Sequence, residues 1–277
     1  IIGAAIQFVP AIQPQVAALT LFQRTPPWVM PRHDHPIDAE KIEAITAPTF
    51  LFGGWHDLFG RSTPRMYSRL NLPAGRKQMV ITDGYHFDMG AGFGGTQAPP
   101  RIDVLERAWF DRWLKGHANG VEHYGPVTLR QQGGTWTAGQ SFPRQGVAPR
   151  RLYLSSECSS SATHCVHDGS LQSTPCTDYT SLHVRADVRG LVSRDMTQVT
   201  AGATMALGKY FTSDARFQER GALSFTSAPV TQQTQISGSM NLRLNVATTA
   251  HEAVWAVTVN DVAPDGTSVV LTNGALS

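Results

Sequence analysis

Apolar and polar positions follow two different patterns along the chain, and the first pattern covers the middle of the sequence. Apolar runs at residues 49–52 and 78–82 each lead into polar residues, and residues 64–70 between them are long enough for a helix. This predicts a strand, a helix and a strand, and in a parallel sheet such a unit brings both strand ends to one edge. Residues 102–115 carry apolar side chains at helical spacing, which predicts a helix covering one face of the sheet.

The second pattern, from Gly125 onward, is typical of β-structure. Residues 127–130 predict a short strand, and residues 143–149 a linker. Alternating segments bounded by turn residues then recur at 151–154, 182–188, 222–225, 240–248, 253–260 and 268–271. Because no long helical pattern interrupts them, residues 150–277 are expected to form an antiparallel β-sandwich of jelly-roll type, truncated at its end. The expected fold class is therefore α/β followed by all-β.

Polar side chains follow both predicted strands of the middle region, at Asp57 and His86. In doubly wound sheets the rim at these strand ends is where chemistry occurs. A carboxylate there can accept the Nδ1–H of an imidazole and stabilise the imidazolium that forms during proton transfer. The alternative is structural, since an Asp after a strand is commonly a turn residue and a His in a Gly-rich turn is commonly solvated. The joint placement favours a catalytic pair, in the order acid then histidine that α/β-hydrolases use.

Several motifs resemble the cocaine-esterase and X-prolyl dipeptidyl-peptidase (CocE/NonD) family of serine hydrolases. They are GGWHDLFG at 53–60, the spacing of twenty-nine residues from Asp57 to His86, WFDRWLKG at 109–116, GGTWTAGQSFP at 133–143 and VNDVAPDGTSVVLTNGAL at 259–276. They occur in the family's order. The resemblance implies that residues 1–46 are the tail of a helical lid, that residues 47–145 are the C-terminal part of an α/β-hydrolase domain, and that the sandwich follows.

A nucleophile is missing from this pattern, because no G-x-S-x-G elbow occurs in the sequence. Ser62 follows Asp57 too closely, and Ser239 opens a predicted strand far from the α/β unit. The resemblance implies that the serine precedes the lid. The chain begins with Ile1 and stops just after a predicted strand, so it is expected to be an inactive fragment that supplies the Asp and His of a Ser-Asp-His triad. The full-length protein is expected to hydrolyse esters or amides through an acyl-enzyme.

The residues after Asp57 bear on the substrate. The resemblance places carboxylates there in relatives that select an α-amino group, whereas this chain has Leu58, Phe59 and Gly60. An apolar wall penalises a cation without a partner, so an uncharged acyl group is favoured. Phe59 is expected to line the acyl pocket with Trp55 nearby, and a core role for both is the alternative. Asp88 keeps open the alternative of an X-Pro dipeptidyl-peptidase.

Composition excludes several classes of partner. With 277 residues, 41% hydrophobic and 16% charged, the chain is long enough for two globular domains. A net charge of +2 without a basic run indicates neither nucleic acid nor a membrane surface, and no apolar stretch reaches the length of a membrane span. Residues 88–95 are rich in glycine but lack the context of a dinucleotide loop, so no cofactor is expected. The expected partner is a small ester or amide; the oligomeric state is open.

Three cysteines lie within nineteen residues, at Cys158, Cys165 and Cys176, alongside His164 and His167. A Cys158–Cys165 disulfide, free thiols and a metal site are the three interpretations, although the spacing matches no C-x₂-C pair. A disulfide favours an exported protein, and the compartment stays open.

A rival interpretation from another class is a non-catalytic binding module, in which the β-sandwich recognises a carbohydrate or a partner beside a degenerate α/β remnant. Exposed aromatic residues on one face of the sandwich would support it. Trp255 lies in an alternating segment, where a core position is the default.

Overall fold

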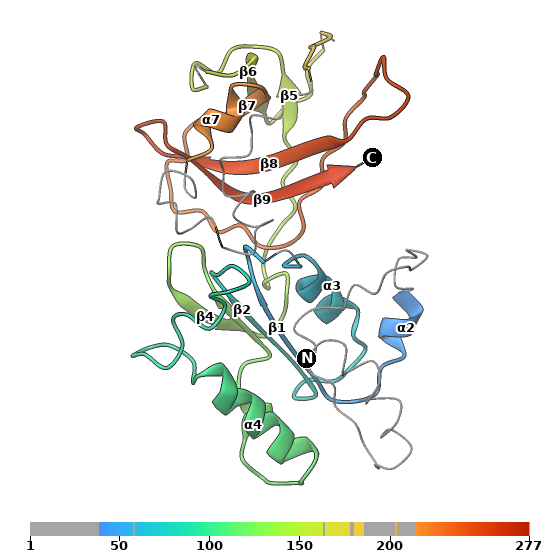
Figure 1. Ribbon diagram of the computed structural model, residues 1–277, viewed down its shortest axis with the longest axis vertical. Coiled ribbons are helices and arrows are strands. Elements are labelled where there is room, and N and C mark those ends of the chain that lie inside the picture. Colours follow the sequence, from blue (N-terminus) through green and yellow to red (C-terminus); the bar gives the residue numbers. More distant parts are fainter. Residues whose placement is uncertain are drawn as a thin grey trace. The chain divides into compact units, whose positions relative to one another are not determined.

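The computed structural model describes residues 39–57, 59–162, 164–177, 180–185, 203 and 214–276, and Figure 1 labels their elements. The chain divides into two compact units, one up to Gln145 and one from Gly146. Of the expected lid tail at residues 1–46, all but the last eight residues lie outside the described part, and those eight include the helix α2 (Ala39–Glu43). The division into lid, hydrolase portion and sandwich stays a prediction. Within the described residues, no helix has both the length and the apolar character that a membrane span requires.

The first unit is built on a mixed sheet. Its strands are β1 (Thr49–Gly54), β2 (Lys77–Thr82), β3 (Val127–Arg130) and β4 (Trp136–Gly139). They follow one another in that order, with β1, β2 and β3 parallel and β4 antiparallel to β3. The helix α3 (Ser62–Arg69) connects β1 to β2, and α4 (Ile102–Trp113) with the short 3₁₀ helix η2 (Val121–His123) precedes β3.

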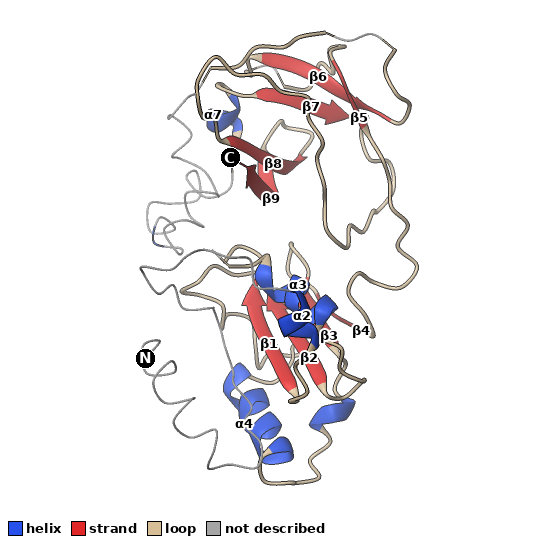
Figure 2. Cartoon of the chain, turned by 90° about the vertical axis from the view of Figure 1, so that its right-hand side faces the viewer, coloured by secondary structure: helices blue, strands red, loops and turns tan. Residues whose placement is uncertain are grey.

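Alternation along the strands sends successive side chains to opposite faces of this sheet, and each face is covered by helices (Figure 2). On one face, side chains of the sheet pack with α2 and α3 in a cluster of Ile42, Leu51, Tyr67, Leu70, Leu72, Met79, Ile81, Val127 and Leu129. On the other face, α4 and η2 contribute to a cluster of Phe50, Val80, Leu105, Trp109 and Val121. Trp109 is fully buried, with its ring centroid 5.6 Å from that of Phe50. The helical spacing of residues 102–115 thus correctly predicts a covering helix.

Two glycines allow the turns beyond β1 and β2 to approach closely. A Cβ on Gly54 would collide with the carbonyl oxygen of Gly84 in the turn after β2. A Cβ on Gly60 would lie 2.6 Å from the carbonyl oxygen of Gly54, which is closer than real Cβ atoms come. The GGWHDLFG segment therefore folds back on itself and against the neighbouring turn only because these positions lack side chains.

The second unit contains two small sheets among its described residues. One consists of β5 (Tyr153–Ser155), β6 (His167–Gln172) and β7 (Leu223–Ser227); the other pairs β8 (Trp255–Val262) with β9 (Ser268–Leu276). The β8–β9 turn contains Gly266 at φ +82°, and its N–H donates to the carbonyl of Ala263 at 2.8 Å. Residues 264–266 therefore lie in a tight turn that joins the two antiparallel strands.

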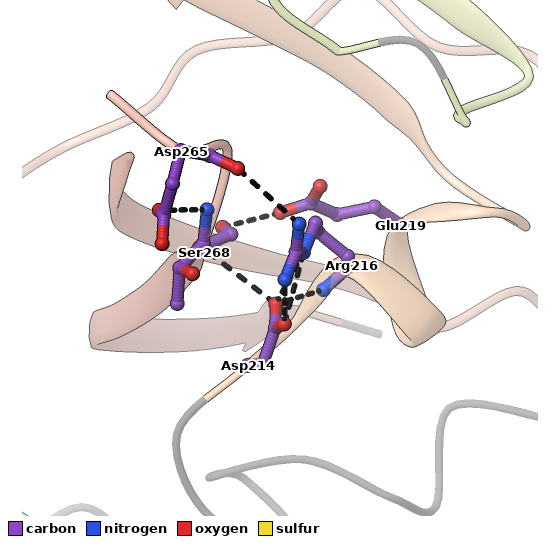
Figure 3. Close-up of polar contacts among 6 residues, drawn as sticks. Asp214, Arg216, Glu219, Asp265 and Ser268 are labelled. Atoms are coloured by element: carbon purple, nitrogen blue, oxygen red, sulfur yellow. Dashed lines mark hydrogen bonds and ion pairs between the residues drawn. The ribbon is translucent and has the colours of Figure 1, made fainter. Parts of the chain in front are cut away.

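Polar contacts tie the short helix α7 (Arg216–Glu219) to the start of β9 (Figure 3). The Arg216 guanidinium contacts the Asp214 carboxylate at 2.6 Å, and Asp214 also accepts from the N–H of Ser268 at 3.4 Å. The buried hydroxyl of Ser268 donates to Glu219 at 2.5 Å. Hydrogen bonds from Arg216 are the main reason that the pKa of Asp214 lies below its ordinary value.

Two predictions for this unit are wrong. The strands were expected to be antiparallel throughout, but β6 and β7 are parallel. Residues 240–248 form no strand, and Leu242 is 50% exposed. Alternation marks a surface that suits a strand, but a strand also needs a neighbour that supplies the hydrogen-bond ladder, and neither the neighbour nor its direction is encoded in the alternation. Of residues 182–188, the first four are not strand and the others lie outside the described residues.

Candidate active site

The backbone hydrogen bonds between β1 and β2 continue into the turns that follow these strands. The N–H of Trp55 donates to the carbonyl of Thr82 at 2.9 Å, and the N–H of His56 donates to the carbonyl of Gly84 at 3.2 Å. The two turns therefore run side by side beyond the carboxyl ends of the strands. This is the rim on which the sequence predicts Asp57 and His86 to meet.

The structure brings the side chains of Asp57 and His86 together. The Nδ1 atom of His86 lies 3.2 Å from Oδ1 and 3.3 Å from Oδ2 of Asp57. Asp57 is 1% exposed, while the imidazole of His86 is 23% exposed. The backbone N–H of Phe59 donates to Oδ1 of Asp57 at 3.2 Å and helps hold the carboxylate. In the tautomer with a proton on Nδ1, Asp57 orients the ring, and Nε2 is the nitrogen available for proton transfer.

The two expected substrate-binding residues differ in their surroundings. The ring of Phe59 lies 6.2 Å from that of His86 in an edge-on arrangement. Trp55 packs against the hydrophobic cluster on the sheet face that α2 and α3 cover, with its ring 6.3 Å from that of Phe142. Its Nε1 donates to the carbonyl of Arg130 at 2.7 Å. Phe59 is therefore beside the candidate pair, whereas the contacts of Trp55 fix it to the sheet. Leu58 lies outside the described residues.

A second histidine and carboxylate pair, which the sequence reasoning missed, lies in the same two turns. The Nε2 atom of His56 is 2.8 Å from Oδ1 of Asp83, and the other carboxylate oxygen of Asp83 accepts from the N–H of Gly133 at 3.3 Å. The side chains of His56 and Asp83 are 5% and 18% exposed. Their position is a signal for the two residues, though not for their pairing: His56 lies two residues after the end of β1, and Asp83 directly follows β2.

Asp88 and Ser62 serve the local turns. Oδ1 of Asp88 accepts from the N–H of Tyr85 at 2.5 Å, and the N–H of Asp88 donates to the carbonyl of Tyr85 at 3.2 Å, so Asp88 closes the turn that carries His86. The hydroxyl of Ser62, at the start of α3, donates to the carbonyl of Phe59 at 2.7 Å. These contacts give both side chains a structural role.

All three cysteines are free thiols, so the structure contains no Cys158–Cys165 disulfide. Cys158 is exposed, and its thiol donates to Asp168 at 3.1 Å. Burial raises the pKa of the Cys165 thiol. The part of the chain that the structure describes contains no group of three or more His, Cys, Asp or Glu side chains arranged to hold a metal ion.

Comparison with known proteins assigns the family. Residues 119–277, more than half of the chain, match the family described as the X-Pro dipeptidyl-peptidase C-terminal non-catalytic domain. The cocaine esterase of Rhodococcus sp. (strain MB1 Bresler) is 24% identical over 282 residues, which cover 94% of this chain and 47% of the esterase. The chain belongs to the CocE/NonD family of hydrolases, and the resemblance seen in its motifs is confirmed.

Other similarities are shorter or weaker. Two Baeyer-Villiger monooxygenases match, one from Pseudomonas aeruginosa (68% identical over 35 residues, 13% of this chain and 7% of the enzyme) and one from Streptomyces coelicolor (71% over 55 residues, 19% and 11%). Segments this short assign no family. A CocE/NonD family hydrolase from Staphylococcus aureus has a TM-score of 0.32 and 12% identity over 48% of this chain and 22% of its own, which is too weak for an argument. The chain spans about half the length of the cocaine esterase and about a tenth or less of each monooxygenase.

Proposed function

We propose that Asp57 and His86 are the acid and the base of a Ser-Asp-His triad in a serine hydrolase that cleaves ester or amide bonds. The observation that carries this proposal is the distance of 3.2 Å between Nδ1 of His86 and a carboxylate buried at the ends of adjacent parallel strands. The serine is proposed to lie outside these 277 residues, because they contain no G-x-S-x-G elbow. The chain's coverage of only 47% of the cocaine esterase leaves room for it elsewhere in the protein.

In this mechanism His86 accepts a proton in one step and returns it in the next. Nε2 of His86 accepts the serine proton while the serine oxygen attacks the substrate carbonyl, and the imidazolium then protonates the leaving oxygen or nitrogen as its bond to carbon breaks. Water repeats the sequence to release the acid and restore the serine. Asp57, 1% exposed, stabilises the imidazolium more strongly than a solvated carboxylate would, because the surrounding protein screens charge less than water does.

An uncharged acyl group is the proposed substrate class. Phe59 presents an aromatic ring beside His86, and Asp88, the alternative partner for a substrate ammonium, is bound into its own turn. An X-Pro dipeptidyl-peptidase is the second candidate, because the description of the matched family names that activity. The proposal predicts faster hydrolysis of a neutral acyl ester than of an X-Pro amide with a free amino terminus. The reverse order would favour the peptidase.

The remaining parts of the chain are proposed to follow the family arrangement. Residues 1–46 would be the tail of the lid, residues 47–145 the C-terminal part of the hydrolase domain, and residues 150–277 a jelly-roll sandwich. The match of residues 119–277 to the family and the antiparallel β8–β9 pair support this proposal, whereas the parallel β6–β7 pair departs from a jelly roll.

The test uses the full-length protein, in which this chain is joined to the serine-bearing part. An activated acyl ester should give a burst of product as the acyl-enzyme accumulates, and His86→Ala should abolish both the burst and the turnover. His117→Ala, a change at an exposed histidine of the same unit, is the matched control and should change neither. Turnover by the 277-residue chain alone that disappears in Ser62→Ala would overturn the proposal, and loss of folding in His86→Ala would favour a structural role.

A further inference from the structure

Two pairs, each formed by one histidine and one aspartate, join the turns beyond β1 and β2. The first turn contributes Asp57 to one pair and His56 to the other, while the second turn contributes His86 and Asp83. We propose that the His56–Asp83 pair is a positioning device that fixes the distance and orientation between Asp57 and His86. This inference rests on the proposed function, because it gives the second pair its purpose.

The two pairs are adjacent along both turns. His56 precedes Asp57 directly, and Asp83 lies three residues before His86. The 2.8 Å contact between His56 Nε2 and Asp83 therefore spans the same gap between the turns as the 3.2 Å contact between His86 and Asp57. If the first contact opened, the turns would lose one of the side-chain contacts that hold them at the separation that the second contact needs.

The His56 side chain is buried where it meets the second turn. The side chain of His56 is 5% exposed, so its hydrogen bond to the Asp83 carboxylate is largely shielded from competing water. Its ring also lies 5.3 Å from the ring of Tyr85, which is buried and directly precedes His86. His56 thus contacts the second turn at two residues, the carboxylate of Asp83 and the ring of Tyr85.

The β3–β4 hairpin is hydrogen-bonded to both turns. The second oxygen of Asp83 accepts from the N–H of Gly133 at 3.3 Å, and the hairpin carbonyl of Arg130 accepts from Nε1 of Trp55 at 2.7 Å. The hairpin therefore holds one residue of each turn. Both Arg130 and Gly133 lie within residues 119–277, which match a family described as non-catalytic. The start of that region accordingly has a positioning role toward the proposed active site.

The discriminating variants separate the hydrogen bond from simple packing. His56→Gln places an amide N–H at about the position of Nε2 and can still donate to Asp83, whereas His56→Leu fills a similar volume without a donor. Asp83→Asn removes the charge from the acceptor. Asp103→Asn is the matched control, because Asp103 forms an exposed ion pair with Arg101 at 3.0 Å, away from these turns.

The experiment has two readouts in the full-length protein. Nitrogen NMR of labelled histidines reports which ring nitrogen of His86 carries the proton, and the Nδ1–H form should lose population in His56→Leu and Asp83→Asn but not in His56→Gln or Asp103→Asn. With the activated ester, kcat should fall by up to about a hundredfold in His56→Leu at nearly unchanged KM, and His56→Gln should recover most of it. Thermal unfolding of each variant checks that the fold is retained.

The outcomes distinguish this inference from the proposed function. An unchanged His86 spectrum in both His56→Leu and Asp83→Asn would overturn the positioning role, whatever the activity. So would equal losses in His56→Gln and His56→Leu, or unfolding of all three variants, because each result would mean that the pair only supports the fold. If His86 responds as expected but His86→Ala still hydrolyses the ester, the positioning role stands and the proposed function fails.

Discussion

Replacing Gly60 with alanine tests the close approach of backbone that shapes the turn after β1. The added Cβ would lie 2.6 Å from the carbonyl oxygen of Gly54, 3.1 Å from that of Trp55 and 3.2 Å from that of Asp57. All three neighbours are backbone atoms, so no side-chain rotation can relieve the contact. Reaching a tolerated 3.0 Å requires a displacement of about 0.4 Å in the backbone that carries Asp57.

The expected cost follows from this crowding. Overpacking of a well-packed site destabilises by about 1–3 kcal/mol, and the reduced freedom of the unfolded chain returns about 0.4–1 kcal/mol of that. Urea denaturation should therefore show a net loss of up to about 2.6 kcal/mol in the free energy of unfolding. Because Asp57 moves with the turn, the full-length protein should also lose ester hydrolysis, by up to about a hundredfold.

Gly90→Ala and Gly95→Ala are the matched controls, because a Cβ at either position would meet no atom within 4 Å. Each should change the free energy of unfolding by no more than about 0.5–1 kcal/mol and leave hydrolysis intact. The reasoning would be refuted if Gly60→Ala were as stable and as active as these controls.

Three further predictions concern the core, the second unit and the thiols. Trp109→Ala should lower the free energy of unfolding by about 3–5 kcal/mol in urea denaturation, because it empties a fully buried site on the α4 face. Hydrogen bonds from Arg216 lower the pKa of Asp214 in the folded protein. The stabilisation from this carboxylate should therefore be complete above its unfolded pKa of about 3.9 and should be lost as the pH falls through the lower folded value. Asp214→Asn should make acid denaturation curves less steep in that pH range. A thiol reagent should modify the exposed Cys158 first and Cys165 more slowly, because burial raises the pKa of the Cys165 thiol, whereas equal rates would contradict this.

The α/β unit was predictable because its elements depend on local pattern. Apolar runs ending in polar residues located β1 and β2, the length of the segment between them located α3, and helical spacing located α4, with ends within a few residues of the structure. Parallel pairing then brought Asp57 and His86 to one rim, which needs only the strand, helix, strand order. Helix ends were less accurate because the last turn depends on contacts beyond the local sequence.

The second unit and the His56–Asp83 pair were not predictable in the same way. The direction of β7 relative to β6 and the lack of a strand at residues 240–248 depend on which segments become neighbours, and one-sided alternation does not carry that information. His56 and Asp83 were visible as polar residues, but their pairing depends on the crossing of two turns and on the N–H of Gly133, fifty residues away from Asp83.

The most direct measurement of the central claim is kcat/KM for ester hydrolysis by the full-length protein with Asp57→Asn, which keeps the shape of the buried side chain but removes its charge. The account predicts a loss of about 10⁴-fold, because the imidazole of His86 would lose the carboxylate that fixes its tautomer, with no comparable loss in the exposed control Asp103→Asn. A folded Asp57→Asn protein that retains kcat/KM within about tenfold of the unaltered protein would contradict the assignment of Asp57 and His86 as a catalytic pair.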